Sequence, residues 1–303
     1  FDNTASDVNV LSQSAFSDFK AALEKLQTIN DIAGVLLTSA KKDFILGADI
    51  TEFTEMFAFD GGELNAVLSD VHLLFNGLED LPCPTVVAVN GMALGGGCEL
   101  ALACDLRVLA KSAKIGLPEV NLGIIPGWGG CVRLPRVIGV DNALEWIASA
   151  RPKAAQDALA QGMVDAVVEP ELLRDAALDL LRKAGDNEID YAARRAQKLQ
   201  PLSLSTVETA MAFETAKAVI AGKAGPHYPA PLAAVKAIQT GASKPRDEAL
   251  ADERATFLEL AQSNVSYSLV GLFLNNQYLK RRATQLSQYA RPVNRAAVLG
   301  AGI

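Results

Sequence analysis

Two glutamates, each beside a cluster of glycines, are the residues whose type and spacing point to chemistry. Glu99 directly follows Cys98 and the glycine run at residues 95–97, in the first turn of a helical pattern. Glu119 comes twenty positions later, directly after a proline, and a second glycine cluster follows at residues 127–130. Such a site offers two kinds of chemical group: carboxylates that move protons, and backbone amides that bind a negatively charged oxygen.

The glycine run at residues 95–97 allows backbone amides to approach a bound substrate closely. The first amides of a helix have no acceptor within the helix, and the helix dipole adds positive potential at the same place. A developing oxyanion is therefore stabilised there. A complete oxyanion hole needs a second amide from another loop. Gly47 permits an unusual backbone turn, which predicts that the amide of Ala48 points into the same cleft.

Two carboxylates beside glycine turns are compatible with several types of reaction. Proton abstraction or addition next to an activated carbonyl fits best, and glycoside hydrolysis fits less well because it has no use for the amide-lined turn. The chain has no GxSxG motif and no histidine near a candidate serine or cysteine nucleophile, which disfavours acyl-enzyme chemistry. The glycine run also lacks the Lys-Ser or Lys-Thr of a P-loop. A structural role stays open, with Glu99 as a helix N-terminal charge and Glu119 as a solvated loop acid.

A layered α/β arrangement is predicted to position these residues. Residues 84–90 predict a buried strand that leads into the glycine run, and residues 34–38 predict a second strand of the parallel type. Between them, apolar residues at helical spacing predict an amphipathic helix over residues 64–78, which a proline-rich segment ends. Asp49 is predicted to cap a further short helix.

The second part of the chain is predicted to be helical, because strand signals nearly vanish after about residue 185. Helical patterns cover residues 204–221, 231–240 and 247–282. We therefore expect an α/β domain at residues 1–188 and a helical linker at residues 189–292. Residues 293–303 are expected to be the first strand of a truncated dinucleotide-binding dehydrogenase domain, since they run into a Gly-x-Gly.

The composition limits the classes of function. Of the 303 residues, 50% are apolar and 21% are charged, which suits a substantial core. The net charge of −7 argues against a general nucleic-acid or anionic-membrane binder. No apolar run is long enough to cross a bilayer, and the first residues do not read as a signal peptide. Four cysteines without CxxC spacing and two distant histidines favour free thiols in a reducing compartment and no metal site.

Three segments, in order, resemble the successive motifs of the crotonase (enoyl-CoA hydratase/isomerase) superfamily. They are ILGADI at residues 45–50, NGMALGGGCEL at residues 90–100 and IGLPEVNLGIIPGWGG at residues 115–130. The resemblance implies an α/β crotonase-like ββα spiral domain without its first strands, followed by an all-helical linker. Residues 225–231, 271–276 and 297–303 are further similar to the alpha-subunit family of bacterial fatty-acid β-oxidation complexes, in which a 3-hydroxyacyl-CoA dehydrogenase follows.

The resemblance assigns roles by motif position. The amides of Ala48 and Gly96 are expected to bind the thioester oxygen of an acyl-CoA. Glu99 is expected to activate a water and Glu119 to deliver a proton to C2. The amide of Gly127 is expected to help place the water. Substrate binding is also expected of Leu46, Gly47 and Asp49.

The implied activity is hydration of 2-enoyl-CoA in fatty-acid β-oxidation, with isomerisation of 3-enoyl-CoA to 2-enoyl-CoA as a second reaction through Glu119. CoA is expected only as part of the substrate, without a metal or redox cofactor, and an NAD site would belong to the truncated domain. The expected partners are the acyl-CoA thioester and a thiolase subunit, with no nucleic acid and no membrane span, in the bacterial cytoplasm. Two alternatives stay open: another crotonase-type enzyme (isomerase only or thioester hydrolase), and an inactive scaffold that docks a thiolase subunit.

Overall fold

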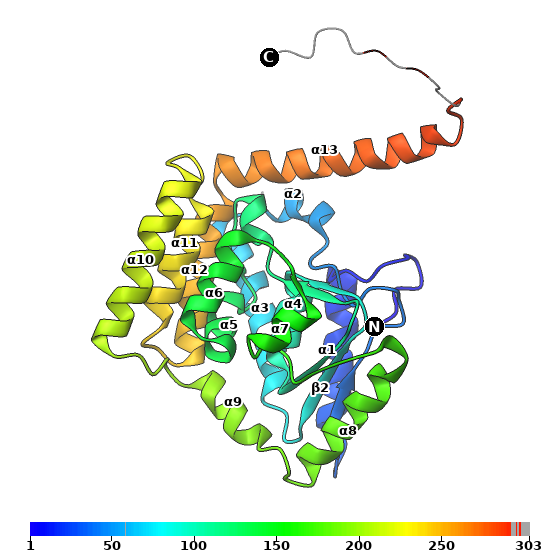
Figure 1. Ribbon diagram of the computed structural model, residues 1–303, viewed down its shortest axis with the longest axis vertical. Coiled ribbons are helices and arrows are strands. Elements are labelled where there is room, and N and C mark those ends of the chain that lie inside the picture. The colour runs from blue at the N-terminus through cyan, green and yellow to red at the C-terminus, as the bar shows by residue number, and fades with distance from the viewer. Residues whose placement is uncertain (58, 292–294, 296, 298–303) are drawn as a thin grey trace.

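Two β-sheets with helices around them make up the first part of the fold (Figure 1). The computed structural model describes residues 1–57, 59–291, 295 and 297. The first sheet is parallel, in the order β1 (Val35–Leu37), β2 (Thr85–Val89), β4 (Leu106–Ala110) and β7 (Ala166–Val168). The second has the order β3 (Met92–Leu94), β5 (Lys114–Gly116) and β6 (Lys153–Ala154), with β3 parallel and β6 antiparallel to β5.

Helices of the first part alternate with these strands. They are α1 (Gln13–Gln27), η1 (Ile50–Glu52), α2 (Phe53–Met56), α3 (Gly61–Glu79), α4 (Gly96–Ala103), η2 (Glu119–Leu122), α5 (Gly130–Ile138), α6 (Val140–Ser149), α7 (Ala155–Ala160), η3 (Pro170–Leu172) and α8 (Leu173–Gly185). The helices of the second part are α9 (Tyr191–Leu199), α10 (Thr206–Ala224), α11 (Ala230–Gly241), α12 (Arg246–Ala261) and α13 (Asn264–Ser287). Helices α10–α13 together form the helical segment.

The strand predicted before the glycine run is β2, and all five of its residues are buried. A strand with parallel neighbours on both sides is covered on both faces, so it reads as a continuous apolar run. β2 leads through Gly91 into β3, and β3 ends directly before the N-cap of α4 at Gly95. The predicted helix over residues 64–78 is α3, and Asp49 caps η1 as predicted.

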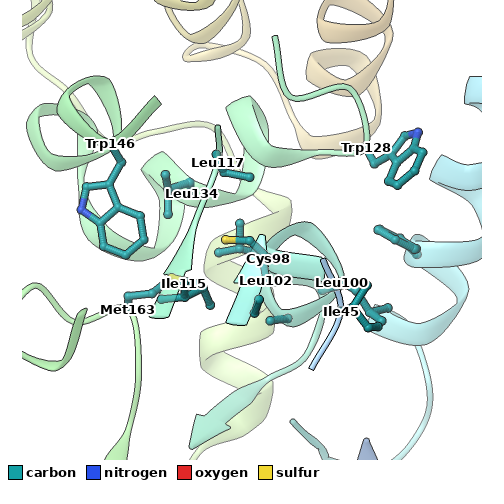
Figure 2. Close-up of a cluster of buried hydrophobic side chains, with 14 of the residues drawn as sticks. Ile45, Cys98, Leu100, Leu102, Ile115, Leu117, Trp128, Leu134, Trp146 and Met163 are labelled. Atoms are coloured by element: carbon teal, nitrogen blue, oxygen red, sulfur yellow. The ribbon is translucent and has the colours of Figure 1, made fainter. Parts of the chain in front are cut away.

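Apolar packing on every side fixes α4 in the interior (Figure 2). All eight residues of α4 are buried, and seven of them are glycine or apolar; the exception is Glu99. Cys98 and Leu102 belong to the same buried cluster as Ile115 of β5 and Leu134 of α5. Each fully buried leucine contributes roughly 1.5–3 kcal/mol of transfer free energy. The first turn of α4, and with it Glu99, therefore has a fixed position in the core.

The single helix expected over residues 247–282 is wrong, because the chain breaks it into α12 and α13. Ser263 is the N-cap of α13, and its hydroxyl accepts a hydrogen bond from the amide of Ser266 at 3.2 Å. Apolar residues at helical spacing continue across this break, so periodicity alone did not reveal it. A serine cap satisfies the amides of a new first turn and allows the helix direction to change.

The helical segment folds back on the first part (Figure 1). Helices α10, α11 and α12 lie side by side, α12 contacts α3 and α5, and α13 passes over η1, α2 and η2. The predicted domain boundary at residues 188/189 falls in the connection between α8 and α9. The strand predicted at residues 293–303 lies almost entirely outside the described residues. Among the described residues, no helix combines the length and apolarity that a membrane crossing requires.

Candidate active site

Glu99 and Glu119 line one pocket, which has a volume of about 70 Å³. Leu46, Gly47, Ala48, Gly96 and Gly127 line the same pocket. Its volume is enough to hold a water molecule, given polar partners. The structure thus brings together seven of the eight residues that the sequence singled out. Their catalytic and binding roles remain predictions.

Glu99 is held by a turn from a distant part of the chain. Its Oε1 accepts hydrogen bonds from the amides of Trp128 and Gly130, both at 2.8 Å. The residue is 2% exposed. Since both bonds use Oε1, Oε2 has no protein donor among the described residues. One oxygen of the carboxylate is therefore fixed, and the other is left for a ligand in the pocket.

Glu119 is the first residue of η2, and its carboxyl group has the opposite environment. The Oε2 atom is buried and has no hydrogen-bond partner among the described residues. Its Oε1 lies close to Gly95, where an added Cβ would be 3.0 Å from it. Leaving a buried polar atom unsatisfied costs roughly 1–3 kcal/mol, so such an atom calls for a functional explanation.

The pocket disfavours two negative charges. Burial raises the pKa of Glu119 to about 8, and the charge of Glu253 adds to this effect. Burial also raises the pKa of Glu99 well above its ordinary value, together with repulsion from Glu119 and Glu253. The amides of Trp128 and Gly130 act against this rise, because they stabilise the ionised form. Because the charges of Glu99 and Glu119 interact, the two acids titrate as a pair.

Two amides at the pocket suit an oxyanion hole. Gly47 has φ +99°, a conformation that favours glycine, and it sets the direction of the following peptide. Hydrogen bonds from Leu11 N to Gly47 O (2.8 Å) and from Asp49 N to Leu11 O (3.2 Å) hold the loop on both sides of Ala48. Within the described part of the chain, neither Ala48 N nor Gly96 N donates to a protein acceptor. Both amides are therefore available to a ligand oxygen.

Two further predicted residues, Asp49 and Gly127, have contacts outside this amide pair. Asp49 does not line the pocket; its Oδ1 accepts from Thr51 N (3.0 Å) and Thr51 Oγ1 (2.6 Å) at the start of η1. Its proposed part in substrate binding stays a prediction. Gly127 does line the pocket, and its carbonyl oxygen is 2.8 Å from Nε2 of His72.

Two residues of the helical segment belong to the site but were not predicted, because the sequence indicated only a linker there. Phe257 of α12 lines the pocket, and Glu253, one turn earlier, reaches the turn that holds Glu99. Glu253 is 1% exposed and stands at helical spacing between the buried residues Leu250 and Phe257. A charged residue within an apolar helical stripe is the signal that could have found it, because charges are rarely fully buried without partners.

Comparison with known proteins places the chain in a family. The family model described as enoyl-CoA hydratase/isomerase matches residues 3–218. The fatty acid oxidation complex subunit alpha of Pseudomonas putida (strain GB-1) is 52% identical over all 303 residues, and so is that of Pseudomonas aeruginosa (strain LESB58). In both comparisons the chain spans 42% of the relative's length.

Solved structures agree with this assignment. The crystal structure of enoyl-CoA hydratase from Bacillus anthracis is 30% identical, with a TM-score of 0.56 and 86% of each chain covered. The enoyl-CoA hydratase from Bacillus halodurans, at 20% identity, shares the fold with a TM-score of 0.63, covering 87% of this chain and 90% of its own. The expected family and crotonase-like fold are therefore confirmed: the chain belongs to the enoyl-CoA hydratase/isomerase family.

Proposed function

We propose that this protein hydrates 2-enoyl-CoA thioesters, adding water across the C2–C3 double bond. The observation that carries the proposal is the pairing of Glu99 and Glu119 in one pocket with the available amides of Ala48 and Gly96. A reaction that needs only one acid would leave the second buried carboxyl without a use. The catalytic residues and substrate are those expected from the family resemblance, and the geometry supports them.

The thioester oxygen accepts hydrogen bonds from the amides of Ala48 and Gly96 in this proposal. As water adds to C3, electrons move onto this oxygen and an enolate develops. The N-terminus of α4 adds its dipole at the same place. The oxygen is more negative in the transition state than in the substrate, so each donor stabilises the transition state more. Each is expected to lower the activation free energy by roughly 3 kcal/mol.

The two acids divide the proton transfers. We assign the ionised form to Glu99, because two amides donate to its Oε1 and oppose the rise in its pKa that burial and the charges of Glu119 and Glu253 cause. Glu99 takes a proton from the water as the oxygen bonds to C3. Glu119 is the neutral partner, since its buried Oε2 lacks a donor, and it gives a proton to C2. A C3–O and a C2–H bond form, and the C2–C3 π bond breaks. Proton exchange between the two acids restores the starting state, so the step requires no metal or redox cofactor.

Isomerisation of 3-enoyl-CoA to 2-enoyl-CoA is a second proposed reaction. Glu119, as its carboxylate, would take a proton from C2 to form a dienolate and return it to C4, so that the π bond moves from C3–C4 to C2–C3. The buried, unpartnered Oε2 of Glu119 favours this reaction, because one unengaged carboxyl oxygen can reach neighbouring carbons in turn.

The metabolic setting is proposed from the relatives. The two Pseudomonas proteins are named as subunits of a fatty acid oxidation complex, which supports a role in β-oxidation. Because the chain spans 42% of their length, a downstream dehydrogenase and a thiolase partner are proposals for a longer protein. A bacterial cytoplasmic location is proposed with them, and the four buried free cysteines are consistent with a reducing compartment.

The test compares Glu119→Gln with Glu171→Gln. Glu171 is a matched control, because it is exposed and also follows a proline in a short 3-10 helix. Hydration of crotonyl-CoA, followed by the loss of its ultraviolet absorbance, should fall about 10²- to 10⁴-fold in Glu119→Gln and stay unchanged in Glu171→Gln. Binding of crotonyl-CoA, measured by calorimetry, should persist in both. Near wild-type hydration by Glu119→Gln contradicts the mechanism, and binding without turnover by the wild type favours a scaffold.

A further inference from the structure

We propose that Glu253, from the helical segment, is a positioning residue that holds the turn at residues 127–131 and thereby orients Glu99. The inference rests on the proposed hydratase function, because it assigns Glu99 its orientation for that reaction. It makes the helical segment a part of the active site. Glu253 is not assigned a contact with substrate.

Four consecutive amides alternate between two carboxylates. Those of Trp128 and Gly130 donate to Glu99 Oε1, both at 2.8 Å. Gly129 N donates to Glu253 Oε1 at 2.7 Å, and Cys131 N donates to Glu253 Oε2 at 2.8 Å. Adjacent peptides thus point to opposite sides of the turn, one side towards Glu99 and the other towards Glu253.

This turn is the N-terminus of α5, where helix amides have no acceptor within the helix. Gly129, the N-cap residue, has φ +107° and no side chain that could cap the helix. Glu253 takes the place of a capping side chain, and its two oxygens satisfy two amides at once. Charge-assisted hydrogen bonds of this kind are the stronger class. The orientation of the other two amides, and hence of Glu99, depends on them.

Residues of α12 also fix Gly127, the first residue of this turn. Arg254 Nη1 lies 3.2 Å from Nδ1 of His72, and since arginine has only donors, Nδ1 accepts. Nε2 therefore carries the hydrogen and donates to the Gly127 carbonyl at 2.8 Å. On the next turn, the Phe257 ring would be 2.4 Å from a Cβ added to Gly127. Glu253 and Phe257 of α12 thus contact residues 127–131 directly, and Arg254 acts on Gly127 through His72 of α3.

Glu253 also sets the charge around the pocket. Its charge contributes to the raised pKa values of Glu99, Glu119 and Cys131. His72 Nε2 lies 3.5 Å from Glu253 Oε1, and Arg136 of α5 also feels the charge of Glu253. The titratable and charged groups facing Glu253 are therefore Glu99, Glu119, Cys131, His72, Arg136 and the neighbouring Arg254. Removing the charge should lower the pKa of the Glu99–Glu119 pair.

The test uses Glu253→Gln, with Glu259→Gln as its control on the exposed face of α12. Glutamine has one acceptor oxygen where glutamate has two, so either Gly129 N or Cys131 N loses its acceptor. The kcat for crotonyl-CoA hydration should fall about 10- to 100-fold with KM within about threefold, because orientation and not binding is lost. The basic limb of the pH–rate profile should also move to lower pH. Glu259→Gln should match the wild type in both.

A second variant separates positioning from folding. Glu253→Asp keeps the charge and both oxygens on a shorter arm, so kcat should fall while the basic limb stays in place. The inference is wrong if Glu253→Gln has the wild-type kcat and the basic limb of its pH–rate profile does not move. If Glu253→Gln does not fold, a wild-type kcat in Glu253→Asp contradicts the inference instead. If Glu253→Gln has a lower melting temperature but the basic limb of its pH–rate profile does not move, Glu253 has only a structural role. This outcome also contradicts the inference. If the wild type itself does not hydrate crotonyl-CoA, this result contradicts the proposed function and not the positioning role of Glu253.

Discussion

At the scale of single residues, the two acids of the pocket differ in what surrounds each carboxyl group. Glu99 accepts two amide hydrogen bonds through one oxygen, whereas Glu119 has a buried oxygen with no donor among the described residues. Hydrogen bonds from amides stabilise a carboxylate, and burial stabilises the neutral acid. At Glu119, burial outweighs the hydrogen bond from the residue's own amide. The same residue type is thus prepared for two different tasks.

The pH dependence of hydration follows from Glu119. Its pKa is raised to about 8 by burial, so the group is protonated below this pH and loses its proton above it. If the protonated acid delivers the proton to C2, kcat/KM should be level at pH 7 and fall about tenfold per pH unit above pH 8, because kcat/KM reports the pKa of the free enzyme. A pH–rate profile from pH 6 to 10, with circular dichroism at each pH to verify folding, measures this. A rate that is level to pH 10 would show that protonated Glu119 is not required.

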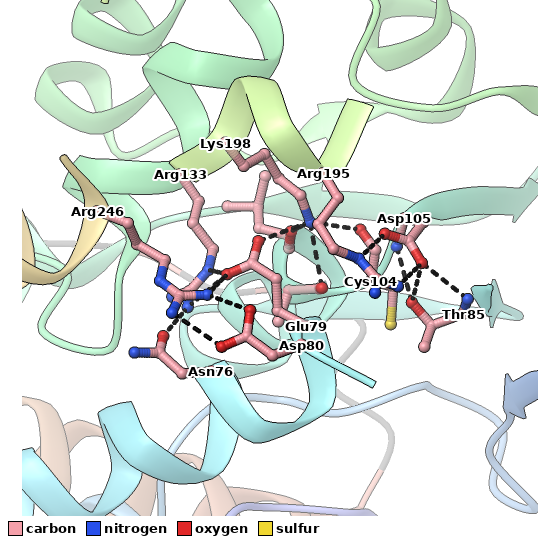
Figure 3. Close-up of polar contacts among 12 residues, drawn as sticks. Asn76, Glu79, Asp80, Thr85, Cys104, Asp105, Arg133, Arg195, Lys198 and Arg246 are labelled. Carbon is pink, nitrogen blue, oxygen red and sulfur yellow. Dashed lines mark hydrogen bonds and ion pairs between the residues drawn. The ribbon is translucent and has the colours of Figure 1, made fainter. Parts of the chain in front are cut away.

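At the scale of elements, a buried ionic cluster joins four helices around Glu79, near the end of α3 (Figure 3). Arg133 of α5 pairs with Glu79 at 3.0 Å, Lys198 of α9 at 2.7 Å and Arg246 of α12 at 3.2 Å. Arg246 also pairs with Asp80 at 2.7 Å. Glu79 is fully buried, so three cations from distant segments depend on one carboxylate.

Replacement of Glu79 by glutamine should destabilise the fold strongly. Loss of one partner from a buried ion pair typically costs about 3–5 kcal/mol, because the remaining charges stay buried without compensation. Urea unfolding at pH 7 measures the change in the free energy of unfolding. Asp70→Asn, on the exposed face of α3, is the control and should have little effect. A loss below about 1 kcal/mol in Glu79→Gln, typical of exposed pairs, would contradict this role.

The same cluster gives the protein an acid-labile contribution to stability. Burial alone would raise the pKa of Glu79, but Arg133, Lys198 and Arg246 outweigh it and lower the pKa to about 2. A depressed folded-state pKa contributes stability above the ordinary value of 4.5, and this contribution is lost as the pH falls towards 2. The difference in unfolding free energy between wild type and Glu79→Gln should therefore shrink over this range.

At the scale of the whole molecule, buried ion pairs join the helical segment to the α/β part, and both parts contribute residues to the active site. Arg246, Glu253 and Phe257 all come from α12, and they reach α3, the start of α5 and the pocket. Such contacts couple the two parts, because neither buries its polar groups without the other.

We therefore expect one cooperative unfolding transition. Trp128 and Trp146 lie in the first part, so their fluorescence reports its unfolding, while circular dichroism at 222 nm also reports α10–α13. Thermal melting followed by both signals should give coincident curves. Two separated transitions would instead show that the helical segment unfolds on its own.

The amino-acid sequence by itself determined the local features of the site. Residues 84–90 predicted β2, Asp49 predicted a helix cap, and the glycine run placed Glu99 in the first turn of α4. These signals act over a few residues, so strand periodicity, capping and glycine turns can be read without the fold. The order of three motifs then indicated the family, which the comparisons confirmed.

Only the tertiary structure decided which distant groups complete this site. The hydrogen bond from Gly129 to Glu253 joins residues 124 positions apart, and no local pattern encodes such a pairing. An apolar stripe on a helix predicts that one face is buried, but it does not say against which part of the protein. The sequence therefore did not distinguish a linker helix from a helix that lines the pocket. The packing of α12 against α3 and α5 made that choice, and with it Glu253 and Phe257 became part of the site.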